Sequence, residues 1–159
     1  MKRLTGILAV AALLFFAACD DSRIFEENKK IDGGQWKSAE PVEFDVEISD
    51  TSQAVNAYIN LRNSPDYGYT NIYLFLTTTF PDGKEAKDTL NCLLADKNGK
   101  WMGKGAGDLL DNRIMLKRNV YFTQKGKYKF RLEHAMRVDP LPNVTDVGFR
   151  IEKAEVNSK

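Results

Sequence analysis

Hydrophobic and polar residues alternate with a period of two along several stretches of this chain. The clearest is Val42 to Ile48, where Val, Phe, Val and Ile alternate with acidic residues. Successive side chains of a β-strand point to opposite faces, so this alternation predicts a strand with one buried and one solvated face. The same period recurs from Val55 to Leu61, from Tyr128 to His134 and from Val147 to Ile151.

Further strand-like segments and turn signals lie between these stretches. Residues 71–80 are almost continuously apolar, β-branched or aromatic, which is typical of a central strand covered on both faces. Turn formers at Pro81-Asp82-Gly83 and Asp96-Lys97-Asn98-Gly99 flank another expected strand, over 85–94. A strand is also expected over 114–122. We therefore predict an all-β fold, an antiparallel β-sandwich of jelly-roll-like form with about eight strands.

The N-terminal residues have a different pattern. Lys2 and Arg3 precede an apolar run that ends in Ala17-Ala18-Cys19. This is typical of the signal peptide of an exported bacterial protein, and the run is shorter than the ~20 residues that cross a bilayer. Ala17-Ala18-Cys19 has the form of a lipobox, so we expect residues 1–18 to be removed and Cys19 to be acylated. The alternative is an ordinary secretory signal with a coincidental cysteine.

The rest of the chain divides into two expected parts. Residues 19–35 are rich in charge and poor in apolar side chains, which predicts a lipidated tether. Residues 36–159 carry the period-two stretches and predict one β-sandwich domain with a single core.

Composition excludes several classes of function. The chain has 23 basic and 22 acidic residues. It therefore lacks the basic excess that would indicate nucleic acid as a partner. With Cys19 acylated, Cys92 has no disulfide partner, and its apolar neighbours predict a buried thiol. His134 is the one histidine and continues the inward phase of its strand, so we expect a buried histidine rather than a catalytic group or a metal ligand. We predict no catalytic residues, no metal and no cofactor.

Several segments together resemble one known family. They are Pro81-Asp82-Gly83-Lys84, the glycine-rich stretch from Leu94 to Asp108, and the ending formed by Ala135-Met136-Arg137 and residues 146–152. These resemble the gliding-motility lipoprotein GldH family of Bacteroidota over nearly the whole mature chain. The family usually has glutamine where this chain has His134, which argues against a special role for that side chain.

The resemblance implies a non-catalytic cell-envelope lipoprotein of the gliding machinery, which is linked to type IX secretion. No enzymatic activity or cofactor comes with the family. The expected partners are the membrane, through the lipid, and envelope proteins of the gliding or secretion machinery. We expect the outer membrane as location, with the domain facing the periplasm.

Three arginines are candidates for an interaction surface. Arg62, Arg137 and Arg150 stand at or near strand ends, and each offers a planar fork to a carboxylate. If they converge with Trp101 on one face, that face is the expected binding surface. The alternative is ion pairing within the domain, for which the candidate carboxylates are Asp88, Asp108 and Asp146.

Two further hypotheses involve sugars. Asp88-Thr89-Leu90 matches the acceptor pattern for periplasmic O-glycosylation in this phylum, which makes Thr89 a candidate modification site. Aromatic side chains near loops suggest an alternative function, that of a carbohydrate-binding envelope lipoprotein, although the tryptophans would equally close the ends of the core. These aromatic residues are Trp36, Tyr67, Tyr69, Tyr73 and Trp101. An envelope hydrolase is the third reading, and it would need carboxylates or His134 to meet in a cleft.

Overall fold

The computed structural model describes residues 20–105 and 107–155. The expected signal peptide, residues 1–18, and Cys19 lie outside the described residues. Within them, regular structure consists of β-strands and one short 3-10 helix, η1 (Asp32–Gly34).

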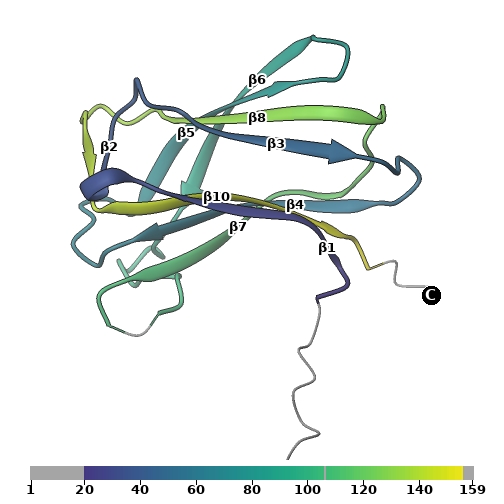
Figure 1. Cartoon of the computed structure of the whole chain (residues 1–159). Coiled ribbons are helices and arrows are strands. Elements are labelled where there is room, and N and C mark those ends of the chain that lie inside the picture. Colours follow the sequence, from purple (N-terminus) through teal and green to yellow (C-terminus); the bar gives the residue numbers. More distant parts are fainter. Residues whose placement is uncertain (1–19, 106, 156–159) are drawn as a thin grey trace, which may run out of the picture.

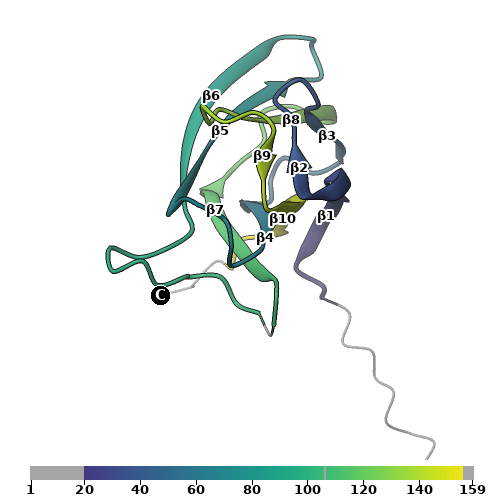
Figure 2. The same cartoon turned by 90° about the vertical axis from the view of Figure 1, so that its left-hand side faces the viewer.

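Two four-stranded antiparallel sheets pack face to face (Figure 1). The first has the order β1 (Arg23–Lys30), β10 (Val144–Lys153), β4 (Val55–Asn63) and β7 (Leu110–Val120). The second has the order β3 (Val42–Ile48), β8 (Gly126–His134), β5 (Asn71–Thr79) and β6 (Glu85–Leu93). A short ribbon of β2 (Gln35–Trp36) and β9 (Leu141–Pro142) lies at one end of the sandwich (Figure 2). The predicted antiparallel β-sandwich is confirmed.

The core lies between the two sheets and is built from the inward positions of the alternating stretches. In β3 and β4 every second residue is buried, as the period predicts. The rings of Phe130 on β8 and Phe149 on β10 stack across the core with centroids 4.4 Å apart. Phe44 on β3 packs on Phe149 at 6.0 Å. Cys92 is buried and belongs to this core cluster, as expected.

The prediction that residues 19–35 form a tether is wrong for most of that segment. Residues 23–30 form β1, which pairs with β10 from Arg23 opposite Glu152 to Lys30 opposite Asp146. The sandwich therefore begins at β1 and not at residue 36, where the sequence placed the start of the 36–159 domain. The sequence hides this strand because it lies at a sheet edge and turns mostly polar side chains to both faces. Phe25 is its one apolar side chain packed against the core.

Gly148 on β10 allows β1 to lie close. A Cβ atom at this position would overlap the side-chain oxygen of Asn28 and lie 2.8 Å from the carbonyl oxygen of Glu27. The exposed Gly68 differs, because a Cβ atom added there would have no heavy atom within 4 Å.

We predict that Gly148→Ala lowers the free energy of unfolding by about 1–3 kcal/mol, because β1 must shift away from β10. The matched change Gly68→Ala should alter it by less than about 0.5 kcal/mol. Urea unfolding of both variants measures this. Equal stability of the two variants would contradict the close packing of β1.

Burial raises the pKa of the Cys92 thiol to about 11. We therefore predict that Cys92 does not react with a thiol reagent at neutral pH until the protein is unfolded. A cysteine introduced by Leu93→Cys should react in the folded protein, because Leu93 is 55% exposed. Reaction of Cys92 in the folded wild-type protein would show that this part of the core is open.

Candidate functional site: the polar face of the first sheet

The outward face of the first sheet carries a row of polar side chains that crosses several strands. Glu26 on β1 lies opposite Arg150 on β10, and Arg150 lies opposite Tyr58 on β4. Two residues further along β1, Asn28 lies opposite Gly148, which lies opposite Asn60. Because side chains on opposed residues of an antiparallel ladder share a face, these groups meet.

Arg150 is the centre of this face. Its guanidinium contacts three carboxylates: Asp20 at 2.5 Å, Glu26 at 2.5 Å and Glu152 at 2.8 Å. The side chain is only 5% exposed, so the charge is taken out of water and is balanced by these acidic groups. Asp20 precedes β1, Glu26 belongs to β1, and Glu152 lies on β10. Arg150 thus fastens the N-terminal segment to the sheet.

The arginine changes the acidity of its partners. The hydrogen bond from Arg150, assisted by one from Ser22, lowers the pKa of Asp20 to about 2. Partial burial raises the pKa of Glu26, but hydrogen bonds from Arg150 and Asn60 outweigh it, so the net pKa is lowered. Both groups are therefore ionised at neutral pH.

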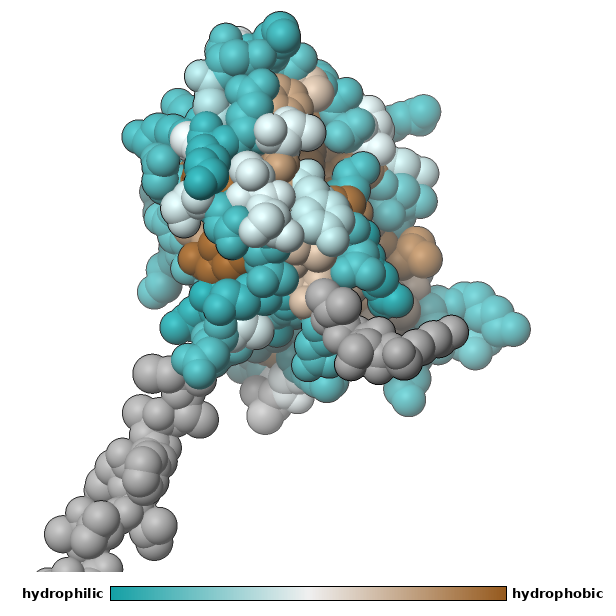
Figure 3. Space-filling model, turned by 90° about the vertical axis from the view of Figure 1, so that its right-hand side faces the viewer, coloured by the Kyte–Doolittle hydropathy of each residue, from teal (hydrophilic) through white to brown (hydrophobic). Residues whose placement is uncertain are grey.

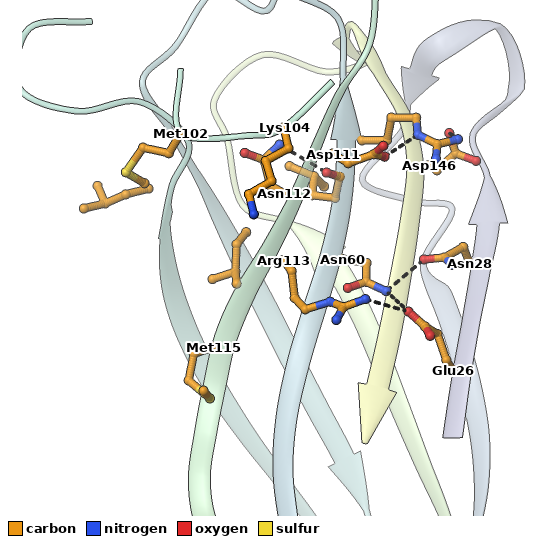
Figure 4. A pocket seen from close by; sticks show the side chains of 14 residues that line it. Glu26, Asn28, Asn60, Met102, Lys104, Asp111, Asn112, Arg113, Met115 and Asp146 are labelled. Carbon is orange, nitrogen blue, oxygen red and sulfur yellow. Dashed lines mark hydrogen bonds and ion pairs between the residues drawn. The ribbon is translucent and has the colours of Figure 1, made fainter. Parts of the chain in front are cut away.

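Hydrogen bonds extend the network across the sheet (Figure 4). The Asn60 side-chain amide donates to Glu26 at 2.9 Å and to Asn28 at 3.2 Å. Arg113 on β7 approaches Glu26 at 3.5 Å. The Tyr58 hydroxyl donates to Glu152 at 2.7 Å. All four strands of the first sheet take part.

Arg62 on β4 forms a second, more exposed ion-pair group at the other end of the same face. Its Nε lies 2.6 Å from Asp111, and its terminal nitrogen lies 3.6 Å from Asp146 (Figure 4). Asp146 was one of the carboxylates considered from the sequence. Asp111 was not, because its cross-strand position depends on the register of β7 with β4.

The four candidate surface residues do not share one place in the fold. Arg62 and Arg150 lie on the outward face of the first sheet. Arg137 is an exposed residue after β8, and Trp101 lies between β6 and β7, half-buried against the core. The prediction that Arg150 offers its fork to a partner needs the clearest correction. Its guanidinium is buried against the protein's own carboxylates and is not available to a partner.

Two of the aromatic residues considered for sugar stacking are buried. Trp36 is 1% exposed, and Tyr67 is buried as well, so both belong to the core. The Trp36 indole N–H donates to the carbonyl oxygen of Glu40 at 3.1 Å. Tyr69 and Tyr73 remain exposed but lie in different segments. The two tryptophans do not form an exposed platform.

His134 is buried beside Trp36, with ring centroids 5.5 Å apart. Its Nε2 lies 3.4 Å from Asp139, whose carboxylate accepts hydrogen bonds from the Ser38 backbone and hydroxyl. The expectation of a buried histidine is confirmed. Within residues 20–105 and 107–155, no three His, Cys, Asp or Glu side chains gather in a way that could hold a metal ion. In that same part of the chain, no helix is long and apolar enough to cross a membrane.

Sequence reasoning missed Asp20, Glu26 and Asn60 as members of the network. Two of them lie in the segment interpreted as a tether, where charge without hydrophobic alternation gave no strand signal. The available signal is the pair Ile24-Phe25, two apolar residues between the charged residues Arg23 and Glu26.

We predict that Arg150→Met lowers the free energy of unfolding by about 3 kcal/mol, since it removes the one buried cation that three neighbouring carboxylates share. Arg113→Met is the matched control. Arg113 is half exposed and makes one ion pair at 3.5 Å, so its loss should cost less than about 1 kcal/mol. Equal effects in urea unfolding would refute the central role of Arg150.

The lowered pKa of Asp20 predicts a pH dependence. A carboxyl whose pKa is lower in the folded state stabilises the protein above its unfolded value of about 4. That stabilisation is lost as pH falls toward the folded value of about 2. Wild type should therefore be more stable than Asp20→Asn at neutral pH, and the difference should vanish near pH 2. A difference independent of pH, measured by unfolding across this range, would argue against the Asp20–Arg150 pair.

Comparisons with known proteins agree with the resemblance seen in the sequence. The family model described as GldH lipoprotein matches residues 23–151, which is the sandwich from β1 into β10. The gliding motility lipoprotein GldH of Flavobacterium johnsoniae is 36% identical over 158 residues, covering 95% of this chain and 97% of that protein. A GldH homolog of Christiangramia forsetii is 35% identical over 153 residues, covering 92% of this chain and 93% of that protein.

Among solved structures, a family GH115 4-O-methyl-alpha-glucuronidase is similar with a TM-score of 0.43 and 7% identity. The match covers 86% of this chain and 18% of that enzyme, a likeness too weak to carry an argument. The family model and the two relatives, by contrast, extend over almost the entire sandwich. The chain belongs to the GldH lipoprotein family.

Proposed function

We propose that this protein is a non-catalytic, lipid-anchored component of the gliding motility machinery, linked to type IX secretion, that acts through contacts with other envelope proteins. The relatives from Flavobacterium johnsoniae and Christiangramia forsetii, which bear the gliding motility name, support this proposal. We place the protein at the outer membrane, with the sandwich facing the periplasm.

The observation that carries the proposal is the attachment of Asp20 to Arg150. Asp20 directly follows Cys19, the expected lipidation site. Consecutive Cα atoms are about 3.8 Å apart, so a lipid on Cys19 would begin at the surface of the sandwich. The domain is then held against the membrane by a short connection, and its orientation is restricted. Such a fixed arrangement suits a protein that presents one surface to a neighbour in an assembly.

The end of the sandwich near the start of β1 suits this placement. Seen from that end, the described surface is mainly hydrophilic, with scattered apolar side chains (Figure 3). A polar end face is compatible with lipid headgroups and does not require insertion into hydrocarbon.

The chemistry of the polar face also favours a structural role over catalysis. General acids work best with a pKa near the working pH. Asp20 and Glu26 instead have lowered pKa values because they are paired with Arg150. Their charge is used to hold the N-terminal segment in place.

The proposal predicts a lipid-dependent complex. In cells, crosslinking followed by recovery of the protein should yield components of the gliding or secretion machinery, identified by mass spectrometry. Cys19→Ala should abolish this recovery, because it removes the acylation site. The proposal would be contradicted if the wild-type and Cys19→Ala proteins both recovered only bulk envelope protein. Restoration of gliding in Flavobacterium johnsoniae lacking its own relative gives an independent readout.

Thr89 is a proposed O-glycosylation site. It lies exposed on β6, in a strand at the edge of the second sheet, so a transferase can reach its hydroxyl. Protein from the native host should then carry a glycan mass that Thr89→Ala lacks. An unmodified intact mass of the wild-type protein would exclude the modification.

A further inference from the structure

Each sheet has two edge strands, and the sandwich is open on the side where β7 of the first sheet and β6 of the second lie at the edge. The opposite side is bridged by β1 and β3, where Phe25 packs on Phe44 and Lys29 donates to the carbonyl oxygen of Glu43 at 2.6 Å. On the open side, Ile114 and Leu116 of β7 point inward but remain only partly buried.

The outer edge of β7 presents unused backbone groups. The amide and carbonyl of Asp111 pair with Lys104, on the side of β7 away from β4. Backbone groups of an antiparallel strand alternate in direction with a period of two, so those of Arg113 and Met115 point the same way. No strand among the described residues pairs with them there. β7 therefore offers a place for an added strand.

Exposed apolar side chains gather beside this edge. Leu93 is 55%, Met102 53% and Met115 39% exposed. With Ile114 they line part of a groove of about 890 Å³. Met102 and Met115 lie on the side of β7 away from Asn60 and Glu26 (Figure 4). Convergent apolar exposure of this kind marks an interaction site, and methionine adapts readily to the shape of a partner.

The charge around the groove selects the kind of partner. The groove is also lined by carboxylates, those of Glu26, Asp111 and Asp146, but each of them is paired with an arginine. Lys104 lines the groove as well, and Lys117 and Arg118 follow Met115 on β7. These three cations form no ion pair with another residue in the described ranges. These unpaired cations attract an acidic segment.

We propose that the free edge of β7 accepts an extended segment of a partner protein in which apolar and acidic residues alternate. The segment adds as a strand beside Arg113 and Met115. Its apolar side chains enter the groove beside Ile114, and its acidic side chains face Lys104 and Lys117. This is strand addition, in which backbone hydrogen bonds give affinity and side-chain alternation gives specificity. The inference rests on the proposed function, because it names the surface through which the protein contacts an envelope partner.

The first test uses the full lipoprotein in detergent and a fluorescein-labelled peptide of alternating valine and glutamate. Binding is measured by fluorescence anisotropy. Met115→Pro removes an amide that points away from β4, which an edge strand tolerates, so binding should weaken about tenfold or more. Met115→Thr keeps the amide and should bind within about threefold of wild type. A peptide with lysine in place of glutamate should bind at least about tenfold more weakly.

Equal binding by Met115→Pro and wild type, with melting temperatures preserved, would overturn the proposal. So would a concentration-dependent dimer of the wild type, seen by sedimentation, that Met115→Pro abolishes. That result would assign the edge to a second copy of the chain.

The second test places a photo-crosslinking residue at Met102, in the groove, or at Glu47, exposed on β3. The proposal expects crosslinks from position 102 that map to an alternating acidic and apolar segment and disappear with Met115→Pro. Crosslinks to machinery components from position 47 alone would overturn this inference and leave the proposed function standing. No crosslink from either position, with gliding unaffected by loss of the protein, would refute the proposed function itself.

Discussion

The structure depends on one buried guanidinium. Arg150 is withdrawn from water in the middle of the first sheet and is balanced by Asp20, Glu26 and Glu152. Two of these carboxylates come from the N-terminal segment, which buries little apolar surface of its own. The segment is held instead by the ladder with β10, by the close approach of Asn28 to Gly148, and by this charge cluster. Removing the arginine would leave the carboxylates to repel one another, which makes it the fastening on which the position of β1 depends.

This fastening gives the sandwich two different sides. β1 and β3 seal one side and lead directly to the expected lipid attachment at Cys19. β7 and β6 leave the other side open, with unpaired backbone on β7 and apolar side chains beside it. A domain held at the membrane by one edge can present the opposite edge in a restricted orientation. The proposed lipid anchor and the proposed partner site thereby lie at separate parts of a small fold.

Much of this architecture follows from the sequence, because strands with one dry face carry a period of two. That period predicted β3, β4, β8 and β10 and the burial of His134. β1 was not predicted, because an edge strand held by polar groups has no such period. For the same reason the N-terminal carboxylates that pair with Arg150 were not predicted. The aromatic residues near loops show a second limit of prediction from sequence. Whether Trp36 faces water or core is set by the packing of the short β2–β9 ribbon, which no local pattern records.

The most direct test of the central claim is hydrogen exchange of the backbone amides of β1 in the acylated protein. If Arg150 fastens this segment, the amides of residues 25–30 that bond to β10 should be protected to nearly the level of β3 and β8. In Arg150→Met their protection should fall selectively, while that of β3 and β8 is retained. Fast exchange of these β1 amides in the wild-type protein would show a free tether and would contradict the account.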